Sequence, residues 1–330
     1  MALQVALHQK LRIDLRRIDR EMKRIVKYDN DVPPGSELEQ ALLQTIEAGG
    51  KRLRPMLVLV GSRFGSRSND QRIIQLAAAA EFIHTASLVH DDLIDRSPLR
   101  RGEPALHTRI GPAKALYVGN YMSARVVELL AQADEQPGGD RRSFTAVATA
   151  ELCLGEYEQL AHAYDYDLSL EDYLLKSRHK TAHLMAVSLE FGARASGAPE
   201  EVCRRLYKFG EHLGLSFQIR DDLLDFTASA EHLGKPSGSD LLGGQVTLPV
   251  LYALEDDALA DEIRRVGPDT RPEDIRPLLD KIRASGSLER AEAFCEAELE
   301  RARDVGRSLS AYPAHEDLLT LADYFGGRTC

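Results

Sequence analysis

Helical spacing of apolar residues is the feature that most limits how this chain can fold. In the first segment these residues recur every three or four positions, on one side of a helix: Leu3, Leu7, Leu11, Leu15, Ile18, Met22 and Ile25. Most later segments repeat this spacing between turn-rich breaks, without a series of alternating strands. We therefore expect an all-α bundle, with one amphipathic helix over residues 3–25 laid on a core.

The breaks between helical segments are short. None of them has the length or composition of a flexible interdomain linker. A chain of 330 residues with 43% hydrophobic content can bury a large core. We predict a single all-α domain over residues 1–330.

The charge and cysteine content limit the classes of protein that fit. A formal net charge of −10 argues against a nucleic-acid partner, because phosphate backbones require a basic surface. The four cysteines lie far apart, without a CxxC pair, which predicts reduced thiols in a cytoplasmic protein. The N-terminus becomes charged too early for a secretory signal, and no apolar run approaches the ~18 residues of a membrane span. We expect a cytoplasmic protein with no integral membrane segment.

The sequence DDLID at residues 91–95 is an acidic cluster at the end of an apolar run. On a helix Asp91 and Asp95 are one turn apart and project from the same face, while Asp92 is rotated by about 100°. The preceding residues 77–90 are mainly apolar and small, so the cluster does not follow a solvated helix face. A lone motif of this kind is more often an exposed acidic helix end. This one is better explained by a bound cation.

A second cluster, DDLLD at residues 221–225, repeats the spacing 130 positions further along. If the two helices face each other, the carboxylates form an oxygen-rich pocket of the kind that binds Mg²⁺ through carboxylates, waters and substrate phosphates. No Cys or His stands at chelating spacing around either cluster, which favours magnesium over zinc. The predicted magnesium-binding residues are Asp91, Asp92, Asp95, Asp221, Asp222 and Asp225.

Basic residues accompany the acidic clusters although the chain has an excess of acid: Lys51, Arg52, Arg54, Arg100, Arg101, Lys180 and Lys235. Each of them alone is weak evidence, since surface Lys and Arg usually face solvent. Metal ions flanked by several cations suit a diphosphate, which accepts bidentate arginine contacts. We therefore expect a diphosphate substrate.

Five motifs occur in order: GGKRLRP (49–55), IHTASLVHDDLIDRSPLRRG (83–102), HKTAHL (179–184), FQIRDDLLD (217–225) and GKPSGSDL (234–241). Together they resemble the motif set of the trans-isoprenyl diphosphate synthases, also called polyprenyl synthetases. The resemblance implies an isoprenoid-synthase helical bundle around a central cavity, usually dimeric. It also implies Mg²⁺-dependent, head-to-tail condensation of isopentenyl diphosphate onto an allylic diphosphate.

The resemblance assigns roles position by position. The direct Mg²⁺ ligands are matched by Asp91, Asp95 and Asp221, with Asp92, Asp222 and Asp225 acting through waters or hydrogen bonds. Contacts to isopentenyl diphosphate are matched by Lys51, Arg54, His84 and Arg101. Contacts to the allylic diphosphate are matched by Arg100, Lys180, Gln218 and Lys235, with Thr181 beside Lys180.

The chemistry follows from these parts. Mg²⁺, Arg100, Lys180 and Lys235 stabilise charge on the departing diphosphate, so that the allylic C–O bond ionises. With Asp91, Asp95 and Asp221 these are the predicted catalytic residues. The double bond of the positioned isopentenyl diphosphate attacks the resulting carbocation. The resemblance suggests that the released diphosphate takes the final proton, and His84 and His90 are competing candidates.

Product length is predicted from the helix before the first acidic cluster. Ser87 and Ala86 stand four and five residues before Asp91, roughly 6 to 7.5 Å along a helix, and both are small. Relatives with short products tend to carry aromatic residues there. We predict an open tunnel and a C30–C50 product such as heptaprenyl diphosphate for quinone side chains, grown from farnesyl or geranylgeranyl diphosphate. Ile83 leaves the exact length open, and a shorter-chain geranylgeranyl or farnesyl diphosphate synthase is the alternative.

The overall pattern most resembles catalytic subunits of heptaprenyl diphosphate synthases. Both a homodimer and a heteromer with a small accessory subunit fit, and release of the product allows peripheral contact with a membrane. A phosphohydrolase with a His90–Asp91 metal pair is disfavoured, because the second cluster has no accompanying histidine. A terpene cyclase or head-to-head synthase would not need the second diphosphate site at Lys51, Arg54 and Arg101. The complete acidic clusters argue against a non-catalytic partner subunit.

Overall fold

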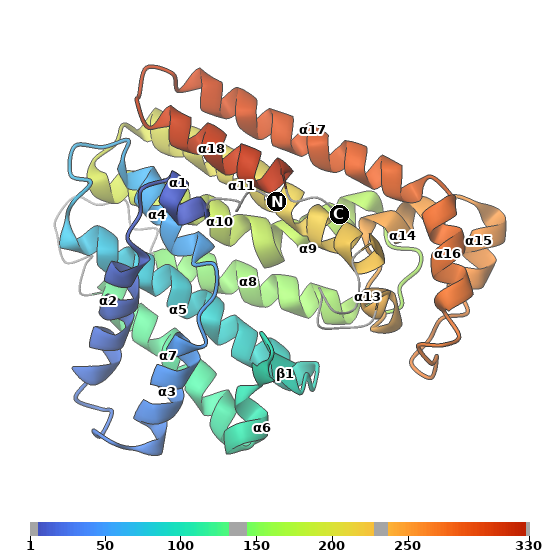
Figure 1. Cartoon of the computed structure of the whole chain (residues 1–330), viewed down its shortest axis with the longest axis horizontal. Helices are drawn as coiled ribbons and strands as arrows, with labels where there is room; N and C mark the ends of the chain where they lie inside the picture. Colours follow the sequence, from blue (N-terminus) through green and yellow to red (C-terminus); the bar gives the residue numbers. More distant parts are fainter. Residues whose placement is uncertain (1–5, 132–143, 228–236, 328–330) are drawn as a thin grey trace. The chain divides into compact units, whose positions relative to one another are not determined.

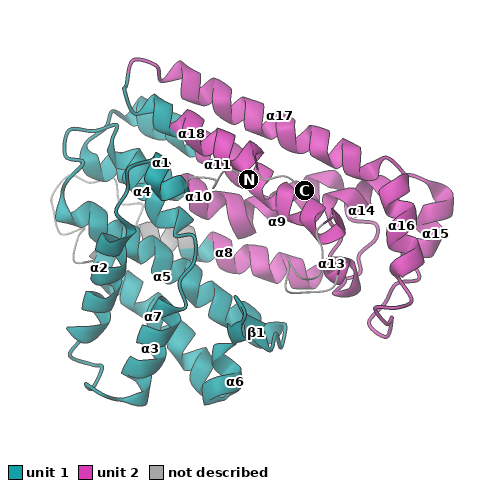
Figure 2. Ribbon diagram, in the orientation of Figure 1, with its two compact units in different colours: residues 1–150, 187–207, 312–317 teal, residues 151–186, 208–311, 318–330 magenta. Residues whose placement is uncertain are grey.

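The computed structural model describes residues 6–131, 144–227 and 237–327. Nearly all regular structure in these ranges is helical, which confirms the all-α prediction (Figure 1). The chain divides into two compact units, which we describe separately (Figure 2). Four of the five unit borders fall inside helices, namely α8, α10, α11 and α18, and the fifth lies between α17 and α18. The single-domain organisation stays a prediction.

Unit 1 comprises residues 1–150, 187–207 and 312–317. Its complete elements are α1 (Leu7–Lys10), α2 (Leu15–Lys27), α3 (Glu37–Glu47), α4 (Leu53–Ser62), α5 (Gln71–Ile94), β1 (Leu99–Arg100), β2 (Glu103–Pro104), α6 (Leu106–Ile110) and α7 (Pro112–Ala131). It also contains parts of α8 (Phe144–Ala161), α10 (His183–Ser196), α11 (Glu200–Thr227) and α18 (His315–Gly326).

Unit 2 comprises residues 151–186, 208–311 and 318–330. Besides the remaining parts of the shared helices, it contains α9 (Leu170–Ser177), the π-helix η1 (Arg178–Ala182), α13 (Ser239–Leu242), α14 (Leu248–Ala253), α15 (Asp257–Ile263), α16 (Arg276–Ala284) and α17 (Ser287–Ser308). Its core is formed by buried apolar side chains of α11, α14, α16 and α17, among others.

Helix α5 is the central element of unit 1. Asp70 caps its N-terminus by accepting a hydrogen bond from the backbone N–H of Arg72. The alanines at 77–80 are fully buried, and the helix packs against α2, α4, α6 and α7. A helix that is apolar on all sides belongs in a protein core. Because its last turn carries Asp91, this packing fixes the position of the first acidic cluster.

Helix α5 also has the length and hydropathy of a membrane-spanning helix, which we did not predict from the sequence. Residues Gln71–Ile94 are long and apolar enough to cross a membrane by length and composition, whereas we expected no such segment. In the structure 72% of its apolar window is buried inside the protein. Core helices of globular proteins pass the same test, so the helix is weak evidence for a membrane span.

The N-terminal amphipathic segment is two helices rather than the one helix predicted over residues 3–25. Helix α1 ends at Lys10, and Arg12 adopts a left-handed backbone with φ of 54°. Asp14 then caps α2 by accepting from the backbone N–H of Arg16. The apolar spacing still reports burial on both sides of the break: Leu7, Leu11, Ile18, Met22 and Ile25 are buried. Leu3 lies outside the described residues.

A short β-hairpin follows the first acidic cluster, where we had predicted no strand. Leu99 pairs with Pro104 and Arg100 with Glu103, in antiparallel register. The two loop residues, Arg101 and Gly102, both have positive φ, at 56° and 83°. Two-residue hairpin loops favour such a backbone because its twist matches that of the strands. The sequence signal was weak, because arginine is uncommon at such a position.

Helices α4 and α10 approach so closely that side chains do not fit between their backbones. A Cβ added at Gly61 would lie 2.0 Å from the carbonyl oxygen of Leu189. One added at Gly192 would lie 2.1 Å from the carbonyl oxygen of Val58. Each helix therefore has a glycine where the backbone of the other helix comes into contact with it. All four residues belong to unit 1.

We predict that Gly61→Ala or Gly192→Ala lowers the free energy of unfolding by about 1–3 kcal/mol, because an added methyl group forces the helices apart. Gly267→Ala is the matched control, since a Cβ there meets nothing within 4 Å. Urea denaturation of the three variants measures the effect. Equal stability of all three would contradict the close contact.

Candidate active site

The three carboxylates of the first acidic cluster differ in solvent exposure. Asp91 is half-buried and Asp95, the C-cap of α5, is exposed, whereas Asp92 is buried. The guanidinium of Arg100 donates from Nε to Asp92 Oδ1 and Oδ2 at 2.8 and 3.1 Å. Strand β1 of the hairpin thus places the Arg100 guanidinium against the buried Asp92 carboxylate. The substrate contact predicted for Arg100 stays a prediction.

The second acidic cluster, on α11 in unit 2, shows the same division. Asp221 is half-buried, while Asp222 is only 2% exposed. Tyr173 Oη on α9 donates to Asp222 Oδ2 at 2.6 Å, and Gln218 Nε2 donates to Oδ1 at 2.9 Å. Burial raises the pKa of Asp222 to about 7, although both of these hydrogen bonds oppose the increase. Asp222 is therefore held by protein donors.

Asp225 is also buried and holds the start of α13. Its Oδ1 accepts from Ser239 Oγ at 2.9 Å, and its Oδ2 accepts from the backbone N–H of Asp240 at 3.2 Å. Its backbone carbonyl accepts from the N–H of Gly238 at 2.9 Å. The carboxylate therefore fixes the last part of the GKPSGSDL motif to α11. Lys235, predicted as a substrate contact, lies outside the described residues.

The basic residues predicted to bind isopentenyl diphosphate belong to unit 1. Gly50 has φ of +139°, and a Cβ there would lie 2.6 Å from both terminal nitrogens of Arg101. The guanidinium of Arg101 thus packs directly on the glycine backbone. Burial and the positive charges of Arg54 and Arg101 hold the pKa of His84 well below its usual 6.5, so its imidazole is neutral at neutral pH. Lys51 is exposed and Arg54 is half-buried.

Arg52, which the sequence reading grouped with the other cations, is buried in a network. Its guanidinium donates to Asp19 Oδ1 at 3.0 Å, to Glu81 Oε1 at 2.9 Å and to the carbonyl oxygen of Ile46 at 2.6 Å. Glu81 is 2% exposed, on the same helix as His84. This network anchors the loop that carries Lys51. Sequence reasoning missed Glu81, although a lone acid within the apolar run 77–90 was a signal.

Lys180 and Thr181 lie in the π-helix η1, a rare geometry found frequently at functional sites. Lys180 Nζ donates to Glu156 Oε2 and Gln159 Oε1 on α8, both at 2.9 Å. Thr181 Oγ1 donates to Gln218 Oε1 at 2.7 Å. Because Gln218 also binds Asp222, η1 is linked through one amide to the second acidic cluster.

Helix α8 approaches η1 at a glycine. A Cβ at Gly155 would lie 2.4 Å from the backbone nitrogen of Lys180, so only glycine fits there. His179 is held from two sides by Glu158, at 2.8 Å from Nδ1, and Glu151, at 3.1 Å from Nε2. Sequence reasoning missed these acids of α8, because carboxylates spread along an amphipathic helix resemble a solvated face.

The donors fit the ion that the acidic clusters predict. Within the described ranges, no three His, Cys, Asp or Glu side chains form a preassembled metal site. The two clusters belong to different units. Asp91, Asp95 and Asp221 have solvent exposure, while Asp92, Asp222 and Asp225 are buried. The three buried carboxylates accept hydrogen bonds from protein donors. Carboxylate oxygens without Cys or His are suited to Mg²⁺.

Comparisons with known proteins, by sequence and by fold, indicate one family. A family model described as polyprenyl synthetase matches residues 35–281. Heptaprenyl diphosphate synthase component 2 of Geobacillus stearothermophilus is 41% identical over 325 residues, which cover 98% of this chain and 98% of that protein. The protein of the same name from Bacillus subtilis (strain 168) is 40% identical over 96% of this chain and 88% of its own length.

Solved structures agree. Heptaprenyl diphosphate synthase from Staphylococcus aureus superposes with a TM-score of 0.88 at 31% identity, covering 99% of this chain and 100% of that chain. A polyprenyl synthase from Caulobacter crescentus CB15, complexed with calcium and isoprenyl diphosphate, gives 0.86 at 32% identity over 98% of both chains. This chain therefore belongs to the polyprenyl synthetase family and is a prenyltransferase.

Proposed function

We propose that the chain is a long-chain trans-polyprenyl diphosphate synthase, which condenses isopentenyl diphosphate onto farnesyl or geranylgeranyl diphosphate. The observation that carries the proposal is the division within each acidic cluster. One or two aspartates retain solvent exposure, while their neighbours are buried and hydrogen-bonded. Similarity to proteins named heptaprenyl diphosphate synthase over nearly the whole chain supports it.

Mg²⁺ would be held by Asp91, Asp95 and Asp221 and would neutralise charge on the departing diphosphate. Buried carboxylates would act indirectly, by holding their helices and the neighbouring hydrogen-bond donors in place: Asp92, Asp222 and Asp225. The Caulobacter crescentus structure, with calcium and an isoprenyl diphosphate, supports a site for a divalent cation and a diphosphate in this fold.

The isopentenyl diphosphate would bind to Lys51, Arg54, His84 and Arg101. The contact of Arg101 with Gly50 brings hairpin and motif loop together, and the buried Arg52–Glu81 pair supports the loop from inside. A neutral His84 would donate its one ring N–H to a diphosphate oxygen in a hydrogen bond, and it carries no second, acidic ring proton. These residues would orient the double bond toward the reacting carbon.

The allylic diphosphate would be held by Arg100, Lys180, Gln218 and Lys235, with Thr181 supporting Gln218. Lys180 is already positioned by Glu156 and Gln159, so its ammonium needs little reorganisation before it contacts the leaving group. Arg100 would contact the diphosphate while its other edge stays on Asp92. The released diphosphate would then accept the proton that completes the reaction.

The acidic clusters give the first test of this proposal. We expect Asp91→Asn and Asp221→Asn each to lower turnover by at least about 100-fold with little change in melting temperature, because a partly exposed carboxylate ligand is replaced by an amide of the same shape. Chelation by EDTA should abolish the wild-type activity, and added Mg²⁺ should restore it. Condensation of labelled isopentenyl diphosphate onto farnesyl diphosphate is the assay.

Two variants serve as controls for that test. Asp261→Asn removes an exposed carboxylate of α15 and should leave turnover unchanged. Asp222→Asn should lower turnover and also stability, by about 1–3 kcal/mol, since it disturbs a buried hydrogen bond from Tyr173. Full activity of Asp91→Asn and Asp221→Asn would rule out the metal assignment. Product from one allylic diphosphate alone would indicate a cyclase.

Product length is tested at Ala86, which is 1% exposed on α5. We predict that Ala86→Phe shortens the product, because in the proposed enzyme the ring would narrow the tunnel for the growing chain. Ala79→Phe, at a fully buried position on the same helix, is the matched control. It should cost about 1–3 kcal/mol of stability by overpacking and leave chain length unchanged. An unaltered product of Ala86→Phe on chromatography would refute the tunnel.

The subunit composition is a further part of the proposal. Two relatives carry the name component 2, which indicates a second component in those enzymes. We propose that this chain is the catalytic component and reaches full turnover with a small accessory subunit. The purified chain alone should then be weakly active and be stimulated by a cellular extract. Full activity as a homodimer, established by ultracentrifugation, would contradict the two-component arrangement.

A further inference from the structure

The N-terminal segment has a charge opposite to that of the whole protein. Residues 6–28 contain eight Lys and Arg against three acidic residues, in a chain with a formal net charge of −10. Two of the acids are engaged with the protein interior. Asp19 accepts a hydrogen bond from buried Arg52, and Glu21 is itself buried and bonded to Arg24 and Gln71. Asp14 is exposed and paired with Arg16, and Asp19 is partly exposed, so this segment presents an excess of positive charge to solvent.

The cations are arranged on the outside of unit 1. Seven exposed residues, which we call the basic surface, are Lys10, Arg12, Arg16, Arg17, Arg20, Arg24 and Lys27. The opposite side of α2 is apolar, and Ile18, Met22 and Ile25 are buried where the helix packs on α3 and α5. The apolar side is thus already used by the protein. Only the charged side remains for an interaction, which excludes insertion of α2 into another apolar phase.

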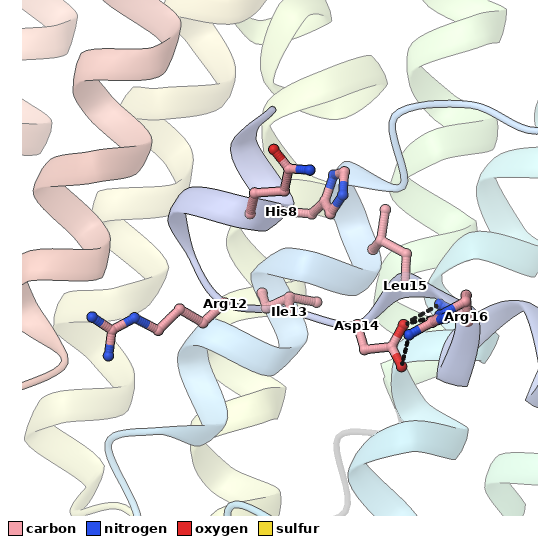
Figure 3. Close-up of a pocket in the computed structure, with 7 residues that line it drawn as sticks. His8, Arg12, Ile13, Asp14, Leu15 and Arg16 are labelled. Carbon is pink, nitrogen blue, oxygen red and sulfur yellow. Dashed lines mark hydrogen bonds and ion pairs between the residues drawn. The ribbon is translucent and has the colours of Figure 1, made fainter. Parts of the chain in front are cut away.

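Two hollows open on this surface. One, of 480 Å³, is lined by His8, Arg12 and Arg16 among others, and Figure 3 shows Arg12 pointing away from Arg16, which is bonded to Asp14. The second, of 240 Å³, is lined by Arg12, Asp14, Arg17 and Arg63 among others, and Arg63 is paired with Asp317. Arg16 is paired with Asp14, whereas Arg12 and Arg17 are exposed guanidinium groups, which give planar, bidentate donors of the kind that bind phosphate groups.

We propose that the basic surface docks the protein onto the anionic headgroups of a lipid bilayer. A cluster of four to eight Lys and Arg is the charge pattern that anionic lipid surfaces attract. Stable protein interfaces usually have an apolar centre that is depleted in charged residues. Between Arg12 and Lys27, however, every exposed residue is charged. Tyr28, 78% exposed, borders the basic surface and is a residue type enriched at membrane–water interfaces.

The choice of a lipid surface also rests on the proposed function. A polyprenyl chain of thirty or more carbons partitions into a bilayer, so a synthase that stays at the headgroups releases its product next to its destination. Electrostatic attraction of the basic surface to anionic headgroups does not depend on the product. The test below therefore measures binding without any substrate, and its outcome is separate from that of the activity assays.

The experiment is vesicle flotation at two ionic strengths. The full-length protein should float with phosphatidylcholine vesicles that contain about one third phosphatidylglycerol, and not with pure phosphatidylcholine, at about 50 mM salt. Raising the salt to about 500 mM should release it, because screening shortens the reach of the surface potential to a few ångströms. Since each Lys or Arg is worth about fivefold in binding, Arg12→Gln/Arg17→Gln/Arg20→Gln should weaken the partition coefficient by roughly 100-fold.

A matched variant separates the basic surface from net charge. Arg264→Gln/Arg265→Gln/Arg276→Gln removes the same charge from exposed positions in unit 2 and should change binding less than twofold. Both triple variants should keep wild-type circular dichroism and, in detergent, wild-type turnover. Failure of the wild type to bind anionic vesicles at low salt, or equal loss in both variants, would overturn the proposal. So would a protein partner that occupies the basic surface while vesicles do not.

Discussion

Burial of carboxylates is the constraint on which the candidate site depends. An ionised carboxylate withdrawn from water must gain partners within the protein, or it becomes protonated. Asp92 is compensated by the cation of Arg100, whereas Asp222 is held by the neutral donors Tyr173 and Gln218. The cationic partner of Asp92 and the neutral partners of Asp222 have the same structural effect. In each cluster the buried acid locks its helix to a neighbouring element, while Asp91 and Asp221 retain exposure.

The cations are positioned by backbone choices as much as by ion pairs. Arg52 and Arg101 both have left-handed backbones, with φ of 49° and 56°, which is uncommon for residues other than glycine. Arg52 is compensated by its buried pair with Glu81, and Arg101 occupies a hairpin loop where that backbone is required. The packing of Arg101 on Gly50 joins the two motifs. The short GGKRLRP sequence thus combines exposed and structural cations.

Sequence reasoning succeeded where a periodic or repeated pattern carried the information. Apolar spacing identified the all-α fold, and the repeated acidic spacing, together with the ordered motifs, identified the family. It could not separate Arg52 from Lys51, because burial of one cation in a loop depends on Asp19 and Glu81 from distant segments. Tyr173 was missed for the same reason. Its contact with Asp222 joins residues 49 positions apart, and no local pattern announces it.

The prediction of one N-terminal helix failed for a local reason, since Asp14 offers the backbone a cap that the apolar spacing does not reveal. That break also separates the exposed Arg12 from the cations of α2, so the basic surface spans a turn and a helix. Charge composition indicated neither feature, because a net charge of −10 averages over a strongly basic segment. Charge has to be examined segment by segment before a type of partner is excluded.

The most direct test of the central claim is a crystal structure of the chain with Mg²⁺ and a non-reactive allylic diphosphate analogue. We expect magnesium ions coordinated by Asp91, Asp95 and Asp221 around a single diphosphate, with Asp92 still bonded to Arg100 and Asp222 still bonded to Tyr173. Metal bound at one cluster alone, with the diphosphate located elsewhere, would contradict this claim.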